Sequence, residues 1–170
     1  MTVMSSTIGA QDFRKACSLF TTGVAVVTAR HGDMQVGMTI NSFASVSLEP
    51  PLVLWSLRDT SRSRPIFEKA GSFAINILSA EQMALAQHFA KGAEDVFDGH
   101  ELVPSALGLP LIADALAHLE CRTRHIYDAG DHRIFVGEVV DLNSRDGTPL
   151  VFFQGRFLPG LPDTNVSGAA

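Results

Sequence analysis

Apolar and polar residues alternate along much of the chain, and this pattern predicts antiparallel strands joined by short turns. Six segments have the alternation or the composition of a strand: residues 24–29, 34–43, 52–58, 72–78, 117–127 and 133–142. The apolar run 150–159 predicts one further strand or a strand pair. Because segment 52–58 is apolar at nearly every position, we expect it to be buried on both faces.

Segment 34–43 has the clearest alternation. One of its faces carries hydrogen-bonding side chains and Gly37, which leaves room for a neighbour to approach closely. The other face is expected in the core and consists of Met34, Val36, Met38 and Ile40.

Helical spacing first occurs near the N-terminus, where Phe13, Ala16, Cys17 and Phe20 recur at i, i+3, i+4 and i+7. These residues predict a helix with an apolar face, ending at about Gly23.

Two later segments also predict helices. Residues 63–70 have Ser63 as a cap and Pro65 in the first turn, and Gly71 follows as the end of the helix. Residues 79–91 open with a serine and a glutamine in capping-box positions.

The order of these elements is not the alternation of strands and helices that builds a doubly wound sheet. Strands come in hairpin-like pairs with short helices between them, and no repeat or linker divides the chain. We therefore predict one domain over residues 1–170, with a core at about 10–160 and a mobile tail at 161–170. The expected fold class is mainly β with peripheral helices, in an antiparallel, Greek-key-like barrel.

The composition narrows the class of protein. The formal net charge of -5 argues against nucleic acid or an anionic membrane as partner, and no segment approaches the length of an apolar membrane helix. The N-terminus lacks the pattern of a signal peptide, and Cys17 and Cys121 form no CxxC motif. We expect a cytoplasmic protein with two buried, reduced thiols.

Several catalytic and cofactor motifs are absent from the sequence. It contains no GxGxxG, GxxxxGK[ST] or GxSxG motif, and its six histidines do not have metal-ligand spacing. We expect no metal site and no cysteine nucleophile.

Two polar stretches remain as candidate sites. In the first, small polar side chains gather where an apolar strand ends: Thr39, Asn41, Ser42, Ser45 and Ser47. In the second, "TSRSR" at residues 60–64, hydroxyls and two arginines precede a helix and form a candidate anion site. Together they suggest a mononucleotide with a flat ring and a phosphate. The alternative is that the first stretch satisfies its own turn and the second is a solvated helix cap.

A third stretch, "GDHRIFVGEVV" at residues 130–140, places a histidine and an arginine at the mouth of an apolar strand. By itself, such a turn also fits side chains that only satisfy backbone groups.

Five segments together resemble the short-chain flavin reductase family: residues 37–57, 61–78, 88–91, 97–99 and 130–140. The resemblance runs in order from about Phe13 to Leu158. It implies a flavin-binding split β-barrel, usually a homodimer, that reduces free flavin with NADH or NADPH. Members of this family are the reductase components of two-component flavin-dependent monooxygenases, so it also implies a monooxygenase as partner.

The resemblance implies roles for individual residues. Residues expected near the flavin, FMN or FAD, are Met38, Thr39, Ile40, Asn41, Ser42, Ser45, Val46, Ser47, Trp55, Ser56, Leu57, Ser61, Ser63, Arg64, Phe89 and Lys91. Residues expected near the nicotinamide cofactor are His132, Arg133 and Phe157, with His132 as the catalytic candidate. Phe157 stands where the family often has a tyrosine, and it therefore lacks a hydroxyl.

Two other functions fit the same barrel. A flavin-binding electron carrier would hold FMN tightly and would not oxidise NAD(P)H. An oxidase of the pyridoxamine-phosphate type would need a basic pocket for a second phosphate, and the sequence has few clustered cations to form one.

Overall fold

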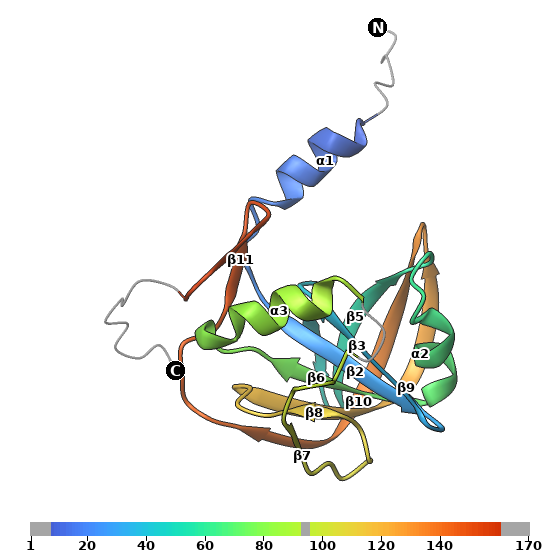
Figure 1. Cartoon of the computed structure of the whole chain (residues 1–170). Coiled ribbons are helices and arrows are strands. Elements are labelled where there is room, and N and C mark those ends of the chain that lie inside the picture. Colours follow the sequence, from blue (N-terminus) through green and yellow to red (C-terminus); the bar gives the residue numbers. More distant parts are fainter. Residues whose placement is uncertain (1–7, 93–95, 161–170) are drawn as a thin grey trace, which may run out of the picture.

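A seven-stranded antiparallel sheet forms the body of the protein in the computed structural model, which describes residues 8–92 and 96–160 (Figure 1). The strands lie in the order β3-β2-β6-β9-β10-β5-β4. Their bounds are Ala25–His31 (β2), Met34–Ile40 (β3), Ala44–Leu48 (β4), Pro51–Arg58 (β5), Ser72–Ile77 (β6), Ala117–Ala129 (β9) and His132–Ser144 (β10). The mainly β, antiparallel class predicted from the alternation is confirmed.

Two smaller sheets flank the body. One joins β1 (Thr22–Gly23) to the C-terminal hairpin of β11 (Val151–Phe153) and β12 (Arg156–Leu158). The other pairs β7 (Leu102–Val103) with β8 (Leu111–Ile112), two short strands that the alternation did not predict. The C-terminal apolar run is thus a strand pair, and Gly23, predicted to end a helix, lies in β1.

The large sheet curls until its first strand reaches its sixth. Ser42, just after β3, accepts a hydrogen bond from the Ser56 N–H of β5 at 3.0 Å. This contact joins two strands that are far apart in the strand order, as the predicted barrel requires. The strand β4 was not predicted, because its small polar residues indicated a strand end.

Two helices pack on the body at the positions the sequence predicted. Helix α2 (Arg64–Ala70) ends at Gly71 in the left-handed conformation (φ 67°) and packs against β2 and β3. Helix α3 (Met83–Ala90) follows a 3-10 turn, Ala80–Gln82, and packs against β3. The predicted capping box is present, since the Ser79 N–H donates to Gln82 Oε1 at 3.1 Å.

Helix α1 (Ala10–Cys17) extends away from the body, as Figure 1 shows. The helix was predicted correctly, but none of its residues is buried, and Phe13 and Phe20 are 61% and 79% exposed. The prediction that Cys17 is buried is therefore wrong, whereas Cys121 is buried.

The largest core cluster centres on Trp55, which stacks on Phe135 at 4.6 Å between ring centroids. Strand β5 buries Val53, Trp55 and Leu57 but leaves the alternate positions half-buried, so the expectation of burial on both faces is wrong.

The predicted core face of β3 is only partly buried. Val36 and Ile40 are buried, but Met34 is 54% exposed. On the opposite face, a Cβ atom at Gly37 would lie 2.5 Å from the Phe89 ring. Gly37 thus permits a close approach, as predicted, and the approaching group is helix α3.

None of the helices in the described part of the chain is long and apolar enough to cross a membrane. The predicted mobile tail, residues 161–170, lies outside the described residues.

Candidate functional site

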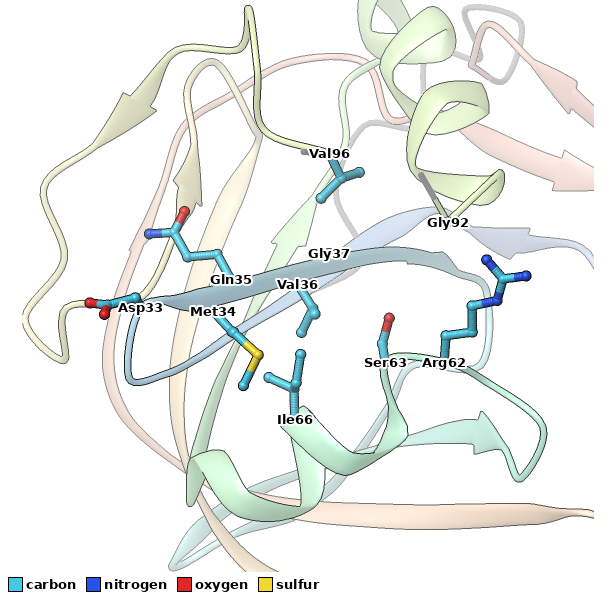
Figure 2. Close-up of a pocket in the computed structure, with 10 residues that line it drawn as sticks. All are labelled: Asp33, Met34, Gln35, Val36, Gly37, Arg62, Ser63, Ile66, Gly92 and Val96. Carbon is cyan, nitrogen blue, oxygen red and sulfur yellow. The ribbon is translucent and has the colours of Figure 1, made fainter. Parts of the chain in front are cut away.

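Two adjoining cavities form a groove along β3, with volumes of ≈ 500 Å³ and ≈ 380 Å³. Figure 2 shows β3 between the start of α2 on one side and the residues Gly92 and Val96 on the other. Both cavities are lined by Gly37, Arg62, Ser63 and Gly92, so they are continuous. We call the two cavities together the β3 groove.

The smaller cavity brings together residues that the sequence placed in separate motifs. Four predicted flavin-binding residues line it: Met38 from β3, Ser61 and Ser63 from the loop before α2, and Lys91 from the end of α3. Hydroxyls and an ammonium group therefore face the same space as an apolar side chain. This combination suits a ligand with an anionic group and an apolar part.

Ser63 occupies the N-cap position of α2, as predicted, but its side chain makes no capping hydrogen bond. In Figure 2 its hydroxyl points into the groove. The Ser61 hydroxyl accepts a hydrogen bond from the Ser63 N–H at 3.3 Å, which fixes the loop that carries both serines.

The two arginines of the "TSRSR" stretch have different surroundings. Arg64 was the predicted phosphate ligand, but its guanidinium pairs with Asp59 at 3.2 Å and Glu68 at 3.6 Å and lines neither cavity of the groove. Arg62 lines both cavities. The structure thus places Arg62, which the sequence did not single out, where Arg64 was expected.

Two polar side chains at the end of β3, those of Thr39 and Ser42, make hydrogen bonds that hold the fold together, and a third, Asn41, lines a cavity. Thr39 Oγ1 donates to the Ala86 carbonyl at 2.7 Å, which ties β3 to α3. Ser42 bonds to the backbone of Ser56, and Asn41 lines a separate, largely apolar cavity of ≈ 210 Å³. Thr39 and Ser42 thus bond to α3 and β5, and neither side chain satisfies its own turn, which was the alternative interpretation of this stretch.

Four predicted flavin-binding residues have buried side chains. Trp55, Leu57 and Phe89 are 0% exposed, and Ile40 is 6% exposed. These side chains form the core, so a ligand in the groove can reach only their backbone. The half-buried Ser56 lies on the other face of β5 and remains available.

Strand β4 carries Ser45, Val46 and Ser47 on the edge of the large sheet. An irregularity in the pairing with β5 falls between Ser45 and Ser47. Ser45 and Val46 are exposed, so their side chains remain available to a ligand or to another protein.

The predicted "GDH" turn forms the tip of the β9–β10 hairpin, with Gly130 at a positive φ of 68°. His132 Nδ1 and Asp131 Oδ1 are 2.7 Å apart. Arg133 pairs with Asp128 across the hairpin and with Asp59, to which its Nε donates at 3.0 Å.

Asp59 links this hairpin to the loop that carries Ser61 and Ser63. Its N–H donates to the Asp131 carbonyl at 2.9 Å, and its carboxylate accepts from both Arg133 and Arg64. The hydrogen bond from Arg133 is the main reason that the pKa of Asp59 lies below its ordinary value. Likewise, the hydrogen bond with His132 lowers the pKa of Asp131.

Phe157 is far from these groups. It lies in β12 and packs on Phe152, with ring centroids 5.3 Å apart. Figure 1 shows β11, its partner strand, on the opposite side of the body from α2. Within one chain, the structure therefore does not bring Phe157 to His132.

The comparisons with known proteins agree on one family. The family described as "Flavin reductase like domain" matches residues 17–160. Among curated proteins, the chain is 48% identical over 147 residues to "FMN reductase (NADH) SmoA" of Agrobacterium fabrum, covering 86% of this chain and 84% of that protein. It is 40% identical over 145 residues to the "4-hydroxyphenylacetate 3-monooxygenase, reductase component" of Thermus thermophilus, covering 85% and 92%.

Solved structures show the same fold. An NADH:FAD oxidoreductase of Streptomyces globisporus, in complex with NAD and FAD fragments, has a TM-score of 0.86 at 38% identity, covering 95% of this chain and 100% of that one. The styrene monooxygenase flavin reductase of Pseudomonas putida S12 has a TM-score of 0.80 at 34% identity, covering 89% and 99%.

Proposed function

We propose that this chain, which belongs to the flavin reductase like domain family, is an enzyme that reduces flavin with a nicotinamide cofactor. The observation that carries the proposal is the β3 groove, where hydroxyls and cations from the loop before α2 and from the end of α3 face the strand β3. Asp59 connects one of these elements to the hairpin that bears His132.

The residues of the groove suit a flavin phosphate at one end. Ser61 and Ser63 offer hydroxyls, and Arg62 and Lys91 offer positive charge in the same cavity. Hydrogen bonds from charged donors to a phosphate are among the stronger ones in proteins. The isoalloxazine ring would lie toward Asn41, Ser45 and Ser56, beyond the end of β3.

The chemistry of hydride transfer is supplied by the nicotinamide and the flavin themselves. The protein has to hold the two rings in contact and to orient them. His132 and Arg133 are the first two residues of β10, beside the tip of the β9–β10 hairpin. Asp59 holds Arg133 in place through a hydrogen bond. We assign His132 to orienting the nicotinamide and Arg133 to attracting the diphosphate of NADH or NADPH.

We further propose that the reduced flavin leaves the enzyme and serves a monooxygenase component. Several relatives are named as reductase subunits or components of monooxygenases. A homodimer in the cytoplasm, where NADH is available, fits this role. A reductase of this kind releases its reduced flavin, whereas an electron carrier would keep the flavin tightly bound.

The test is a steady-state assay of NADH and NADPH oxidation with FMN, FAD and riboflavin as acceptors. A reductase should turn over many equivalents of added flavin, and the protein should lose its flavin on gel filtration. A protein that stays yellow after gel filtration and oxidises neither nicotinamide would instead be an electron carrier. Absence of both activities would refute the proposal.

A further inference from the structure

The strands β7 and β8 and the loop between them form a hairpin over residues 102–112, which we call the strap. Its side chains Leu109 and Leu111 pack with Ala74 of β6 in a small cluster that is separate from the main core. The apolar contact between the strap and the large sheet is therefore limited, and other interactions have to hold the strap in place.

Buried polar side chains of the large sheet supply these interactions. Thr28 Oγ1 donates to the Pro110 carbonyl at 2.6 Å, and the Ile112 N–H donates to Asn76 Oδ1 at 2.9 Å. His118 Nε2 lies 2.7 Å from the Ile112 carbonyl oxygen. In the described part of the chain five polar or charged residues are buried, and four of them bond to the strap: Thr28, Asn76, His118 and Glu120.

Glu120 of β9 makes three bonds to the strap. One of its carboxylate oxygens accepts from Ser105 Oγ at 2.6 Å and from the Leu107 N–H at 2.8 Å. The other oxygen accepts from the Ala106 N–H at 2.8 Å. Glu120 is 2% exposed, and none of the ion pairs formed by the described residues includes it. Because a buried carboxylate without a cation depends on its hydrogen bonds, Glu120 and this loop fix each other.

The strap continues the segment 96–101, which forms part of the wall of the β3 groove. Val96 is buried and lines the larger cavity of the groove. At the other end of the segment, the Glu101 carbonyl accepts a hydrogen bond at 3.0 Å from the N–H of Ala113, directly after β8. This end of the wall segment is therefore bonded to the base of the strap.

Helix α3 supports the end of the segment that begins at Val96. His88 Nε2 lies 2.9 Å from the Val96 carbonyl oxygen, and Phe97 packs on Phe89 with ring centroids 5.4 Å apart. The wall segment thus has two supports, α3 at one end and the strap at the other. A strap that moves relative to the large sheet would shift the wall against α3 and change the shape of the groove.

We propose that Glu120 is a positioning residue for the β3 groove, which acts through the strap and the segment 96–101. It lines neither cavity of the groove. The inference rests on the proposed function, because FMN serves as the probe of the groove. Glu120→Gln replaces one acceptor oxygen by an amide nitrogen that can only donate, so at least one backbone N–H of the loop loses its acceptor.

Hydrogen exchange measured by mass spectrometry tests the coupling without an enzyme assay. In Glu120→Gln the amides of the strap and of segment 96–101 should exchange about tenfold faster than in the wild type, while those of β2 and β3 stay unchanged. The matched control is Glu138→Gln, because Glu138 bears the same charge on the neighbouring strand but bonds to Arg124. It should change neither segment.

Faster exchange in the strap with segment 96–101 unchanged contradicts the coupling. If Glu120→Gln does not fold, Ser105→Ala is measured instead, since it removes one of the three bonds and keeps the carboxylate. It should give the same pattern with a smaller amplitude, and an unchanged segment 96–101 in this variant would equally contradict the coupling.

FMN binding and steady-state kinetics give the second readout, at a temperature where every variant is folded. In Glu120→Gln the Kd and KM for FMN should rise about three- to tenfold with kcat within about twofold of wild type, because the wall shifts while the groups that touch the reacting rings are unchanged. A role in stability alone would lower Tm and leave the Kd of the folded protein unchanged. That outcome contradicts the inference and leaves the reductase function standing, whereas faster exchange with weaker FMN binding supports it even in a protein that oxidises no NADH.

Discussion

Asp59 Oδ1 accepts a hydrogen bond from Arg133 Nε at 3.0 Å, although the two residues are 74 positions apart in the chain. The same oxygen accepts a second bond, from Arg64 at 3.2 Å. The carboxylate therefore joins the start of α2 to the start of β10. The loop that carries the groove serines and the hairpin that carries His132 are thereby held in one arrangement.

We expect Asp59→Asn to raise KM for NADH by about three- to tenfold, since the amide keeps the shape but loses two charge-assisted bonds. The measurement is steady-state oxidation of NADH at saturating flavin. Asp128→Asn is the matched control, because Asp128 also pairs with Arg133 but its side chain is 80% exposed. Equal effects of the two substitutions would contradict a special role for Asp59.

The Asp59 contacts also predict a pH dependence of stability. Arg133 lowers the pKa of Asp59 below the ordinary value of 3.8, so the carboxylate stabilises the folded state above that pH. This contribution is lost as the pH falls from 3.8 through the lowered pKa. The Tm difference between wild type and Asp59→Asn should be constant from about pH 5 to 8 and shrink at more acidic pH. A difference that grows on acidification would contradict this assignment.

His132→Ala should raise KM for the nicotinamide cofactor or slow flavin reduction by about tenfold to a hundredfold, with flavin affinity near wild type. One positioning hydrogen bond is lost while the β3 groove is unchanged. Anaerobic stopped-flow measurement of flavin reduction gives the rate directly. A turn histidine with only a structural role would instead lower stability and affect both ligands, or neither.

The local conformations in this fold could largely be predicted from the sequence. Gly71 ends α2, and Ser79 with Gln82 forms the capping box, because each depends on residues only a few positions away. The close approach at Gly37 was also predicted, although the approaching group, Phe89, could not be.

The directions of the long side chains in the site could not be predicted. Arg62 and Arg64 cannot be distinguished in the sequence "TSRSR". In the structure the carboxylates of Asp59 and Glu68 pair with Arg64, whereas Arg62 lines the groove. Trp55 resembles a ring-lining residue in a short motif, but Phe67 and Phe135 hold it in the core. A cue for burial was present, since Trp55 alternates in phase with Val53 and Leu57 along β5.

The placement of Arg62 leads to a test that differs from the one the sequence alone would suggest. Arg62→Ala should weaken FMN binding by about tenfold or more, since a hydrogen bond to a charged group contributes about 1.5–3 kcal/mol. Riboflavin, which lacks the phosphate, should bind both proteins equally. Arg64→Ala is the control and should leave the FMN affinity within about threefold of wild type. Loss of FMN affinity in Arg64→Ala alone would restore the original assignment.

The exposed face of α1 predicts association with a second copy of the chain. Phe13 on α1 and Phe20 just after it are 61% and 79% exposed, and both belong to the helical face that the sequence predicts to be apolar. We expect light scattering at micromolar concentration to give the mass of a dimer. Substituting both phenylalanines by aspartate should give a monomer, whereas substituting both by leucine should not.

The rate of thiol labelling at Cys17 tests the same interface independently. Cys17 lies on α1 and is exposed in the single chain, so it should react slowly in the dimer and quickly in the aspartate variant. Cys121 serves as the internal control, because burial raises its pKa to about 12 and keeps it unreactive in both proteins. Both thiols should react once the protein is unfolded. A wild type that scatters as a monomer and labels at Cys17 as fast as the aspartate variant would contradict association through α1, because nothing would then cover the apolar face of the helix.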